Sequence, residues 1–249
     1  MIQASPESTR KSFPKTWLAV AASILFLIGV LLLIPAMVLR PAEKKDSLLQ
    51  LFELHADTEI SGISRNSYPE LAEALSSFLA GNTVTAQVML TRGSEDFPAF
   101  SDKELLHLQD VKDLFVLSHR VSLAGVLTII VTIFIIIIEQ NGNAFGKAFI
   151  IVRSLKFSLG LSILFLLAGS VLTALNFNNS FTLMHRLVFS NDLWLLDPQA
   201  DLLVQLMPEP FFIAYAHTAL IRVAFFLIIS LGITLLIQRT LYKGIRKNA

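Results

Sequence analysis

The distribution of charge along this 249-residue chain constrains its fold more than any other feature. Three long apolar stretches contain no charged residue, and a fourth contains only Arg222, close to one end; they are residues 17–39, 121–138, 157–175 and 219–237. A helix needs roughly 20 apolar residues to cross the hydrocarbon core of a bilayer. Since that core has no water to satisfy backbone polar groups, each stretch is expected to be helical. The pattern predicts an all-α membrane protein with four transmembrane helices.

Two other interpretations of these stretches are less favoured. Only 16% of the residues are charged, whereas an average soluble domain has about 25%, so buried core helices of a soluble protein explain the stretches poorly. The first stretch is also longer than the apolar region of a cleaved signal peptide, which spans roughly 7 to 15 residues. We therefore interpret residues 17–39 as a retained membrane anchor.

The charges between the stretches predict the orientation of the chain. Residues 1–16, 139–156 and 238–249 together contain ten basic and two acidic residues. Short basic segments stay in the cytoplasm, which predicts that both termini are cytoplasmic and that residues 139–156 form a cytoplasmic loop. Residues 40–120 and 176–218 are then two outer loops, and we expect them to form a mostly helical extracytoplasmic domain.

The first outer loop contains two helix start signals. Residues 67–70 (Ser-Tyr-Pro-Glu) combine a capping serine, an early proline and a capping-box glutamate, and Gly81 is typical of the end of that helix. Residues 101–104 (Ser-Asp-Lys-Glu) form a second capping box, and no helix breaker follows before Ile138. We therefore expect one helix to run from the outer domain into the second span. Residues 84–90 alternate weakly, which predicts a short strand.

The second outer loop is unusually apolar for an exposed segment. Its aromatic residues include Phe181, Phe189, Trp194, Phe211 and Phe212. Aromatic rings favour the membrane interface, and packing under the first outer loop is the alternative. Helical periodicity is poor in this loop, so several short helices and turns are expected.

The residues that the chain lacks limit its chemistry. It has no cysteine, which removes disulfides, thiolate metal sites and cysteine nucleophiles. It also has no pattern typical of a serine nucleophile, a phosphate-binding loop or a zinc site. We expect no cofactor and no metal, and the net charge of +1 suggests no nucleic-acid partner.

Five histidines remain, all in the predicted outer segments or at the outer ends of spans: His55, His107, His119, His185 and His217. An unperturbed pKa of about 6.5 suits a histidine to proton transfer near neutral pH. Taken singly, each has a structural explanation, such as a solvated surface or a polar anchor at the interface.

Two charged residues accompany these histidines. Asp110 follows His107 by one helical turn and is expected to orient its ring. Arg222 has two interpretations of equal weight. Charges inside spans usually face a functional site in the bundle interior, whereas a long side chain near the end of a span can reach the interface.

Two sequence blocks carry a resemblance to a known family. They are residues 100–112 (FSDKELLHLQDVK) and 184–198 (MHRLVFSNDLWLLDP), with a weaker third block at residues 68–82. These blocks resemble a family of four-span bacterial integral membrane proteins that includes the lipoprotein intramolecular transacylase Lit.

The resemblance implies an activity and a site. The family's reaction moves the sn-2 acyl chain of a diacylglyceryl lipoprotein to the amine of its N-terminal cysteine, which gives a lyso-form lipoprotein. The implied partners are a diacylated lipoprotein and membrane lipids, and the implied location is the bacterial cytoplasmic (inner) membrane, with the active site on its extracytoplasmic side. The family's two functional histidines fall on His107 and His185; the supporting candidates are Asp110, Trp194, Asp197 and Arg222.

The residues themselves are compatible with this chemistry, because the nucleophile belongs to the substrate and the protein has mainly protons to move. Arg186 stands where a less basic residue is expected in the family, and a cation there predicts a lowered pKa for His185. The alternative is a non-catalytic membrane protein that binds a partner through its apolar outer loop. A transporter is the weakest hypothesis, since the spans contain no interior charge beyond Arg222 and no inverted repeat.

Overall fold

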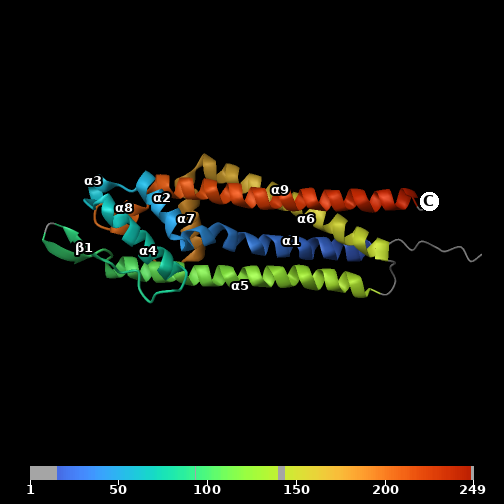
Figure 1. The fold of residues 1–249 in the computed structure, drawn as a ribbon, viewed down its shortest axis with the longest axis horizontal. Helices are drawn as coiled ribbons and strands as arrows, with labels where there is room; N and C mark the ends of the chain where they lie inside the picture. The colour runs from blue at the N-terminus through green and yellow to red at the C-terminus, as the bar shows by residue number, and fades with distance from the viewer. Residues whose placement is uncertain (1–15, 93, 140–143, 248–249) are drawn as a thin grey trace, which may run out of the picture. The chain divides into compact units, whose positions relative to one another are not determined.

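The computed structural model describes residues 16–92, 94–139 and 144–247, and most of them are helical (Figure 1). The helices are α1 (Thr16–Leu39), α2 (Lys45–His55), α3 (Thr58–Ser61), α4 (Tyr68–Leu79), α5 (Asp102–Ile138), α6 (Ala144–Leu175), α7 (Phe177–Val188), α8 (Leu202–Leu206) and α9 (Glu209–Lys247). Two short 3-10 helices, η1 (Arg40–Glu43) and η2 (Arg65–Ser67), and one hairpin, β1 (Met89–Arg92) with β2 (Glu95–Pro98), complete the described elements.

Within the described residues, four helices are long and apolar enough to cross a membrane: α1, α5, α6 and α9. This confirms the predicted fold class. The helices extend beyond the predicted apolar stretches, because α6 begins at Ala144 and α9 begins at Glu209. A helix can continue beyond the hydrocarbon core through polar residues, because its backbone hydrogen bonds are the same inside and outside the core.

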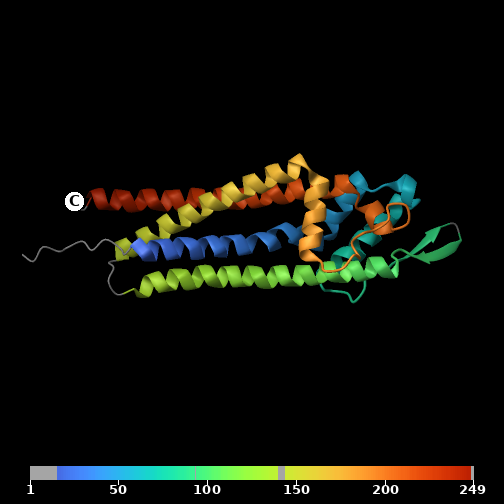
Figure 2. The same ribbon diagram turned by 180° about the vertical axis from the view of Figure 1, so that it is seen from behind.

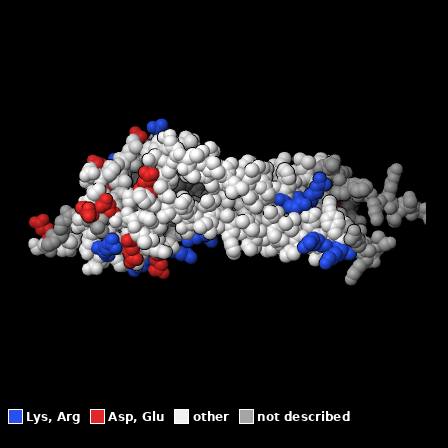
Figure 3. All heavy atoms as spheres, turned by 90° about the horizontal axis from the view of Figure 1, so that it is seen from above, with Lys and Arg blue, Asp and Glu red and all other residues white. Residues whose placement is uncertain are grey.

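The chain divides into two compact units, and the long helices contribute to both. Unit 1 consists of the described parts of Met1–Leu31, Gly125–Ser162 and Leu227–Ala249, and unit 2 consists of Leu32–Ala124 and Ile163–Phe226. On the face drawn in Figure 3, Asp and Glu lie over unit 2 together with several Lys and Arg, whereas the charged side chains visible over unit 1 are mainly Lys and Arg. Most of the remaining surface of the span helices on that face is uncharged.

Unit 1 is packed through small residues and through a cluster of buried apolar side chains that includes Phe26, Ile136 and Ile150. Ser154 and Ser158 on α6 are fully buried, and their hydroxyls donate to the backbone oxygens of Ala19 (3.1 Å) and Ser23 (2.7 Å) on α1. At Gly29 on α1, a β-carbon would lie 2.6 Å from Ile129 Cγ1 on α5, so only glycine allows this approach. Small residues and inter-helix hydrogen bonds of this kind hold helices together in lipid.

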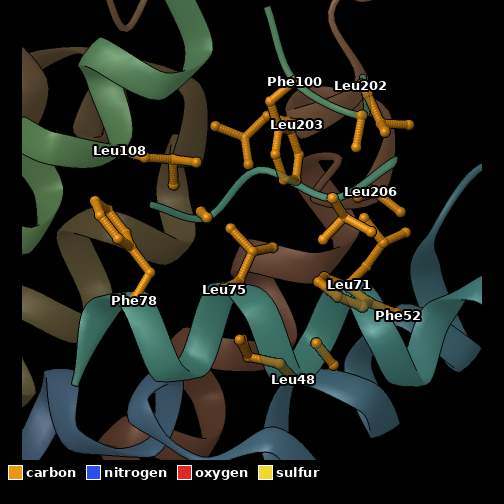
Figure 4. Packing of buried hydrophobic residues seen from close by; sticks show 14 of the residues in the cluster. Leu48, Phe52, Leu71, Leu75, Phe78, Phe100, Leu108, Leu202, Leu203 and Leu206 are labelled. Atoms are coloured by element: carbon orange, nitrogen blue, oxygen red, sulfur yellow. The ribbon is translucent and has the colours of Figure 1, made fainter. Parts of the chain in front are cut away.

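Unit 2 has a hydrophobic core of the kind found in water-soluble domains. Large side chains from α2, α4, α8 and the start of α5 converge in it (Figure 4). Phe52 is completely buried, with its ring edge-on to Tyr68 at 6.1 Å between centroids and stacked on Phe211 at 5.9 Å. Burial of such a side chain contributes roughly 1.5–3 kcal/mol through the hydrophobic effect.

The predicted first residues of α4 are correct, but the predicted capping by the Ser67 side chain is wrong. The helix covers Tyr68–Leu79, but the Ser67 side chain makes no capping hydrogen bond. Ser67 already has helical backbone angles because it ends η2, and the side chain of Ser64 instead accepts from the Asn66 backbone N–H, which it meets at 3.3 Å. Gly81 ends the segment with a φ of 81°, as expected for a helix terminator.

The predicted strand at residues 84–90 is displaced along the chain. The hairpin begins at Met89, and Leu90 pairs with Phe97. Before the hairpin, the Gln87 side chain makes two hydrogen bonds to the backbone of Phe100. Its Nε2 donates to the Phe100 carbonyl oxygen at 2.7 Å, and its Oε1 accepts from the Phe100 N–H at 3.0 Å. A side-chain bond of this kind replaces the ladder that a longer strand requires.

The predicted capping box of α5 is confirmed. Glu104 Oε2 accepts from the backbone N–H of Ser101 at 2.7 Å, and the Ser101 hydroxyl accepts from the backbone N–H of Glu104 at 3.4 Å. As predicted, the helix then continues without a break to Ile138. In unit 2, α7 runs across the direction of α5 and α9 (Figure 2).

Candidate active site

His107 lies on α5 and is 7% exposed. Glu104, one turn earlier, is buried beside the start of the helix and does more than cap it. Its Oε1 accepts from the backbone N–H of Leu203 at 2.6 Å, which ties α8 to α5. The capping-box glutamate therefore fixes both the first turn of the helix that holds His107 and the start of α8.

His185 lies in the last turn of α7 and is also 7% exposed. The Asn176 side chain caps this helix by accepting from the Asn179 backbone N–H at 3.1 Å. Phe181 lies one turn before His185, and its ring meets that of Phe212 on α9 at 5.0 Å, which seats α7 in unit 2. His185 Nδ1 is 2.8 Å from the Phe181 carbonyl oxygen. Because a carbonyl only accepts, this bond assigns the proton to Nδ1 and leaves Nε2 with a free lone pair.

The two imidazoles face each other across a short gap. Their ring centroids are 6.2 Å apart, although 78 positions separate the residues in the sequence. Phe189 contacts both rings, at 5.3 Å from His107 and 5.6 Å from His185. Trp194 lies 5.0 Å from His185 between ring centroids, and Phe181 lies 4.1 Å from it. The pair is therefore enclosed by aromatic rings on several sides.

Burial controls the protonation of both rings. The pKa of His107 is lowered to about 4, by burial first and by the nearby His185 and Lys103 as well, while the charge of Asp110 raises it. The pKa of His185 is also lowered, by burial first, while the hydrogen bond to Phe181 raises it. The predicted direction for His185 is right, but the cause is burial and not the exposed Arg186. Both histidines are neutral at pH 7 as a result.

His107 Nδ1 is a buried atom without a hydrogen-bond partner among the described residues. A buried polar group left unpaired costs roughly 1–3 kcal/mol. Such an atom is a ready binding point for a hydrogen-bonding group of a substrate. An open pocket of about 170 Å³ is lined by Phe189 and Trp194, which contact the pair, and by residues that include Arg186 and Asn191; neither histidine lines it.

The supporting candidates have different positions. Trp194 contacts His185, as described above. Asp110 accepts from Asn191 Nδ2 at 2.8 Å and affects His107 through its charge, so it is not hydrogen-bonded to the ring that it was expected to orient. Asp197 instead shapes a turn, with its Oδ1 accepting from the Gln199 backbone N–H at 2.9 Å.

Arg222 is exposed on α9, and no ion pair involves it in the part of the chain that the structure describes. Of the remaining histidines, His119 is 3.1 Å from Glu43 through its Nε2, which gives it a structural role. Neither His55 nor His217 makes a ring contact with the pair.

Sequence reasoning missed three contributors to the site: Phe181, Phe189 and Asn191. The first two carried a signal, because they and His185 are spaced four residues apart and so lie along one face of α7 and its continuation. Asn191 carried no such signal, since its partner Asp110 is 81 residues away.

The fold and the site together define a class of protein: a membrane-integral helical protein with two buried imidazoles paired in one of its units. A family model described as "Lipoprotein intramolecular transacylase Lit" matches residues 20–212, a range that includes both histidines. The chain belongs to this family. The family is named for an enzymatic activity, which confirms the expected class of protein.

Solved structures agree with this assignment at the level of the fold. The lipoprotein intramolecular transacylase Lit from Bacillus cereus is similar to this chain with a TM-score of 0.65 and 20% identity, over 94% of this chain and 100% of that one. Two variants of the Bacillus cereus protein, with one histidine replaced by arginine or alanine, give TM-scores of 0.56 and 0.57 at 18% and 19% identity, each over 94% of both chains. A comparison with curated protein sequences found no match.

Proposed function

We propose that this protein is a membrane acyltransferase that moves the sn-2 acyl chain of a diacylglyceryl lipoprotein to the amine of its N-terminal cysteine, using His107 and His185. The observation that carries the proposal is the approach of the two imidazoles to 6.2 Å between ring centroids. They come from the two loops that the sequence places on the outer side of the membrane. Family membership supports the substrate class.

The reaction requires the displacement of two protons. The substrate amine enters as an ammonium, loses one proton to a base, attacks the ester carbon, and loses a second proton as the amide forms. The bond between that carbon and the sn-2 oxygen breaks, and the departing alkoxide takes a proton to become the free hydroxyl of the lyso-form. One proton is therefore passed from nitrogen to oxygen and the other is released to water.

Two neutral imidazoles suit this exchange. His185 Nε2 has a free lone pair, because Nδ1 is committed to the Phe181 carbonyl, and we assign it as the base. A buried imidazolium is a strong acid, since burial disfavours its charged form, so a proton taken up by the pair is readily given to the alkoxide. General acid–base catalysis of this kind contributes about 10²- to 10⁴-fold. Proximity of amine and ester in one substrate supplies further acceleration.

The surface of α7 provides a place for acyl chains. Leu183, Met184, Leu187 and Val188 are exposed apolar residues on the helix that holds His185, and Leu187 is 77% exposed. An amphipathic helix of this type lies at the boundary between headgroups and acyl chains. We therefore assign the site to the surface of the bacterial cytoplasmic membrane. The charges of the short segments favour its extracytoplasmic side, with both termini in the cytoplasm.

The test is expression of the full chain in a bacterial host that makes diacylated lipoproteins and has no such activity of its own. Mass spectrometry of the released lipopeptides should find an acyl chain on the cysteine amine and a free sn-2 hydroxyl. His107→Gln and His185→Gln should each reduce product formation by about 100-fold or more.

His217→Gln is the matched control, because this exposed histidine of unit 2 makes no ring contact with the pair. It should leave the amount of product unchanged. Diacylated lipoprotein that stays unmodified in the presence of the wild-type chain, or full activity of the His107→Gln and His185→Gln variants, would refute the proposal.

A further inference from the structure

The segment that follows α7 is attached to α5 at two points. Asn191 Nδ2 donates to Asp110 Oδ2 at 2.8 Å, and Lys103 Nζ donates to the Leu195 backbone oxygen at 2.5 Å. The two attachment points on α5 are seven residues apart, or roughly 10 Å along an ideal helix. His107 lies between them. The segment therefore runs along α5 beside the buried imidazole.

The attached segment forms one wall of the histidine site. Phe189, just before Asn191, contacts both imidazoles, and Trp194, just before Leu195, contacts His185. Each aromatic ring is thus adjacent to an attachment point. Release of the Asn191 end would let Phe189 move away from the gap between the two imidazoles.

The two ends of the Asn191 side-chain amide bind different partners. Its Oδ1 accepts from the Leu193 backbone N–H at 3.1 Å, which closes a local turn. The amide oxygen is therefore committed, and the amide nitrogen faces Asp110. A carboxylate is a stronger acceptor than a neutral oxygen, by roughly a factor of two in hydrogen-bond strength.

We propose that Asn191 is a positioning residue for acyl transfer: its amide, bound to the Asp110 carboxylate, holds the segment from Phe189 to Trp194 against His107 and His185. The inference rests on the proposed function. It assigns Asp110 the role of anchoring this segment, beyond any effect of its charge on the His107 ring. A displacement of about 1 Å in the residues that position the reacting groups can reduce the rate by on the order of 100-fold.

An exchange of the two side chains tests the proposal. Asn191→Asp keeps the oxygen that accepts from Leu193 but replaces the donor with a second carboxylate beside Asp110, so the rate should fall by about 10- to 100-fold. The double variant Asp110→Asn/Asn191→Asp has the same composition as the wild type and restores one donor and one carboxylate. It should recover activity to within about fivefold of wild type, while the single variant Asp110→Asn loses less than Asn191→Asp.

The matched control is Asp113→Asn on the same helix. Asp113 accepts from Gln109 Nε2 at 3.0 Å and, among the described residues, makes no hydrogen bond or ion pair with the segment from Phe189 to Trp194. This variant removes one carboxylate from α5 and should keep the wild-type rate. The thermal midpoint of each variant in detergent is measured in parallel, because recovery of rate by the exchange at an unchanged midpoint separates positioning from general stability.

Two results would overturn the inference. One is wild-type activity of Asn191→Asp; the other is a double variant that is no more active than Asn191→Asp, which would mean that the Asp110 charge acts on His107 directly. Failure of the proposed function has a different signature, because the wild-type chain itself would then give no lyso-form product.

Discussion

Unit 1 and unit 2 are both helical, yet different interactions hold them together. Unit 1 packs α6 on α1 through buried serines whose hydroxyls bind backbone oxygens of the neighbouring helix. Unit 2 buries large rings such as Phe52 and Phe100 in a continuous core. The hydrophobic effect acts on a core that would otherwise meet water, and it does not act between helices surrounded by lipid. The difference predicts that removal of a buried ring in unit 2 costs far more than removal of an inter-helix hydroxyl in unit 1.

The largest effect is expected from Phe52→Ala. This ring is completely buried between Tyr68 and Phe211, so its removal leaves a cavity and should cost about 3–5 kcal/mol of stability. Thermal unfolding in detergent measures the loss, and Phe52→Leu should retain most of the stability. A change below about 1 kcal/mol would mean that this cluster is not a core of the water-soluble type.

A smaller effect is expected from acid. Folded protein keeps His107 neutral down to about pH 4, whereas in the unfolded chain the ring binds a proton below about pH 6.5. Between these values the unfolded state binds more protons, so stability falls as the pH falls, by about 3 kcal/mol in total. Stability of wild type and His107→Leu, measured from pH 7.5 to 4, should diverge in this window.

The comparison variant for the acid effect is His55→Leu, a substitution outside the histidine site of unit 2. Its stability should follow the wild-type pH dependence. An equal acid slope in wild type and in His107→Leu would show that the His107 ring is not protected from protonation in the folded protein.

The smallest effect is expected in unit 1, from Ser158→Ala. The substitution removes the hydroxyl bond to the Ser23 backbone oxygen, and such bonds contribute roughly 0.6 kcal/mol on average between helices in membranes. The change in thermal midpoint should accordingly be much smaller than for Phe52→Ala. A loss as large as that of Phe52→Ala would remove the distinction between the two units.

The sequence predicted the helices more accurately than it predicted the side-chain hydrogen bonds at their ends. The four apolar stretches, the uninterrupted α5 and the Ser101–Glu104 capping box all depend on residues close together in the chain, and each was predicted. The N-cap of α4 and the position of β1 were missed, because Ser67 is already part of η2 and the Gln87 side chain binds the backbone of Phe100. Competing local bonds of this kind leave little trace in a hydrophobic pattern.

Only part of the candidate site corresponds to the predicted residues. His107, His185 and Trp194 are adjacent in unit 2, whereas Asp197 shapes a turn and Arg222 is exposed. The sequence could not indicate that Asp110 binds Asn191, since hydrogen bonds across 81 residues depend on how two loops are placed.

By itself, the sequence determined that this chain folds in a membrane, because the cost of an unpaired backbone group in hydrocarbon makes long uncharged stretches helical. Tertiary structure decided the burial, the protonation and the proximity of His107 and His185. Two imidazoles that are ordinary in the unfolded chain become buried, neutral and adjacent only when α7 crosses α5, since burial and proximity are properties of the packed chain and not of any segment of it.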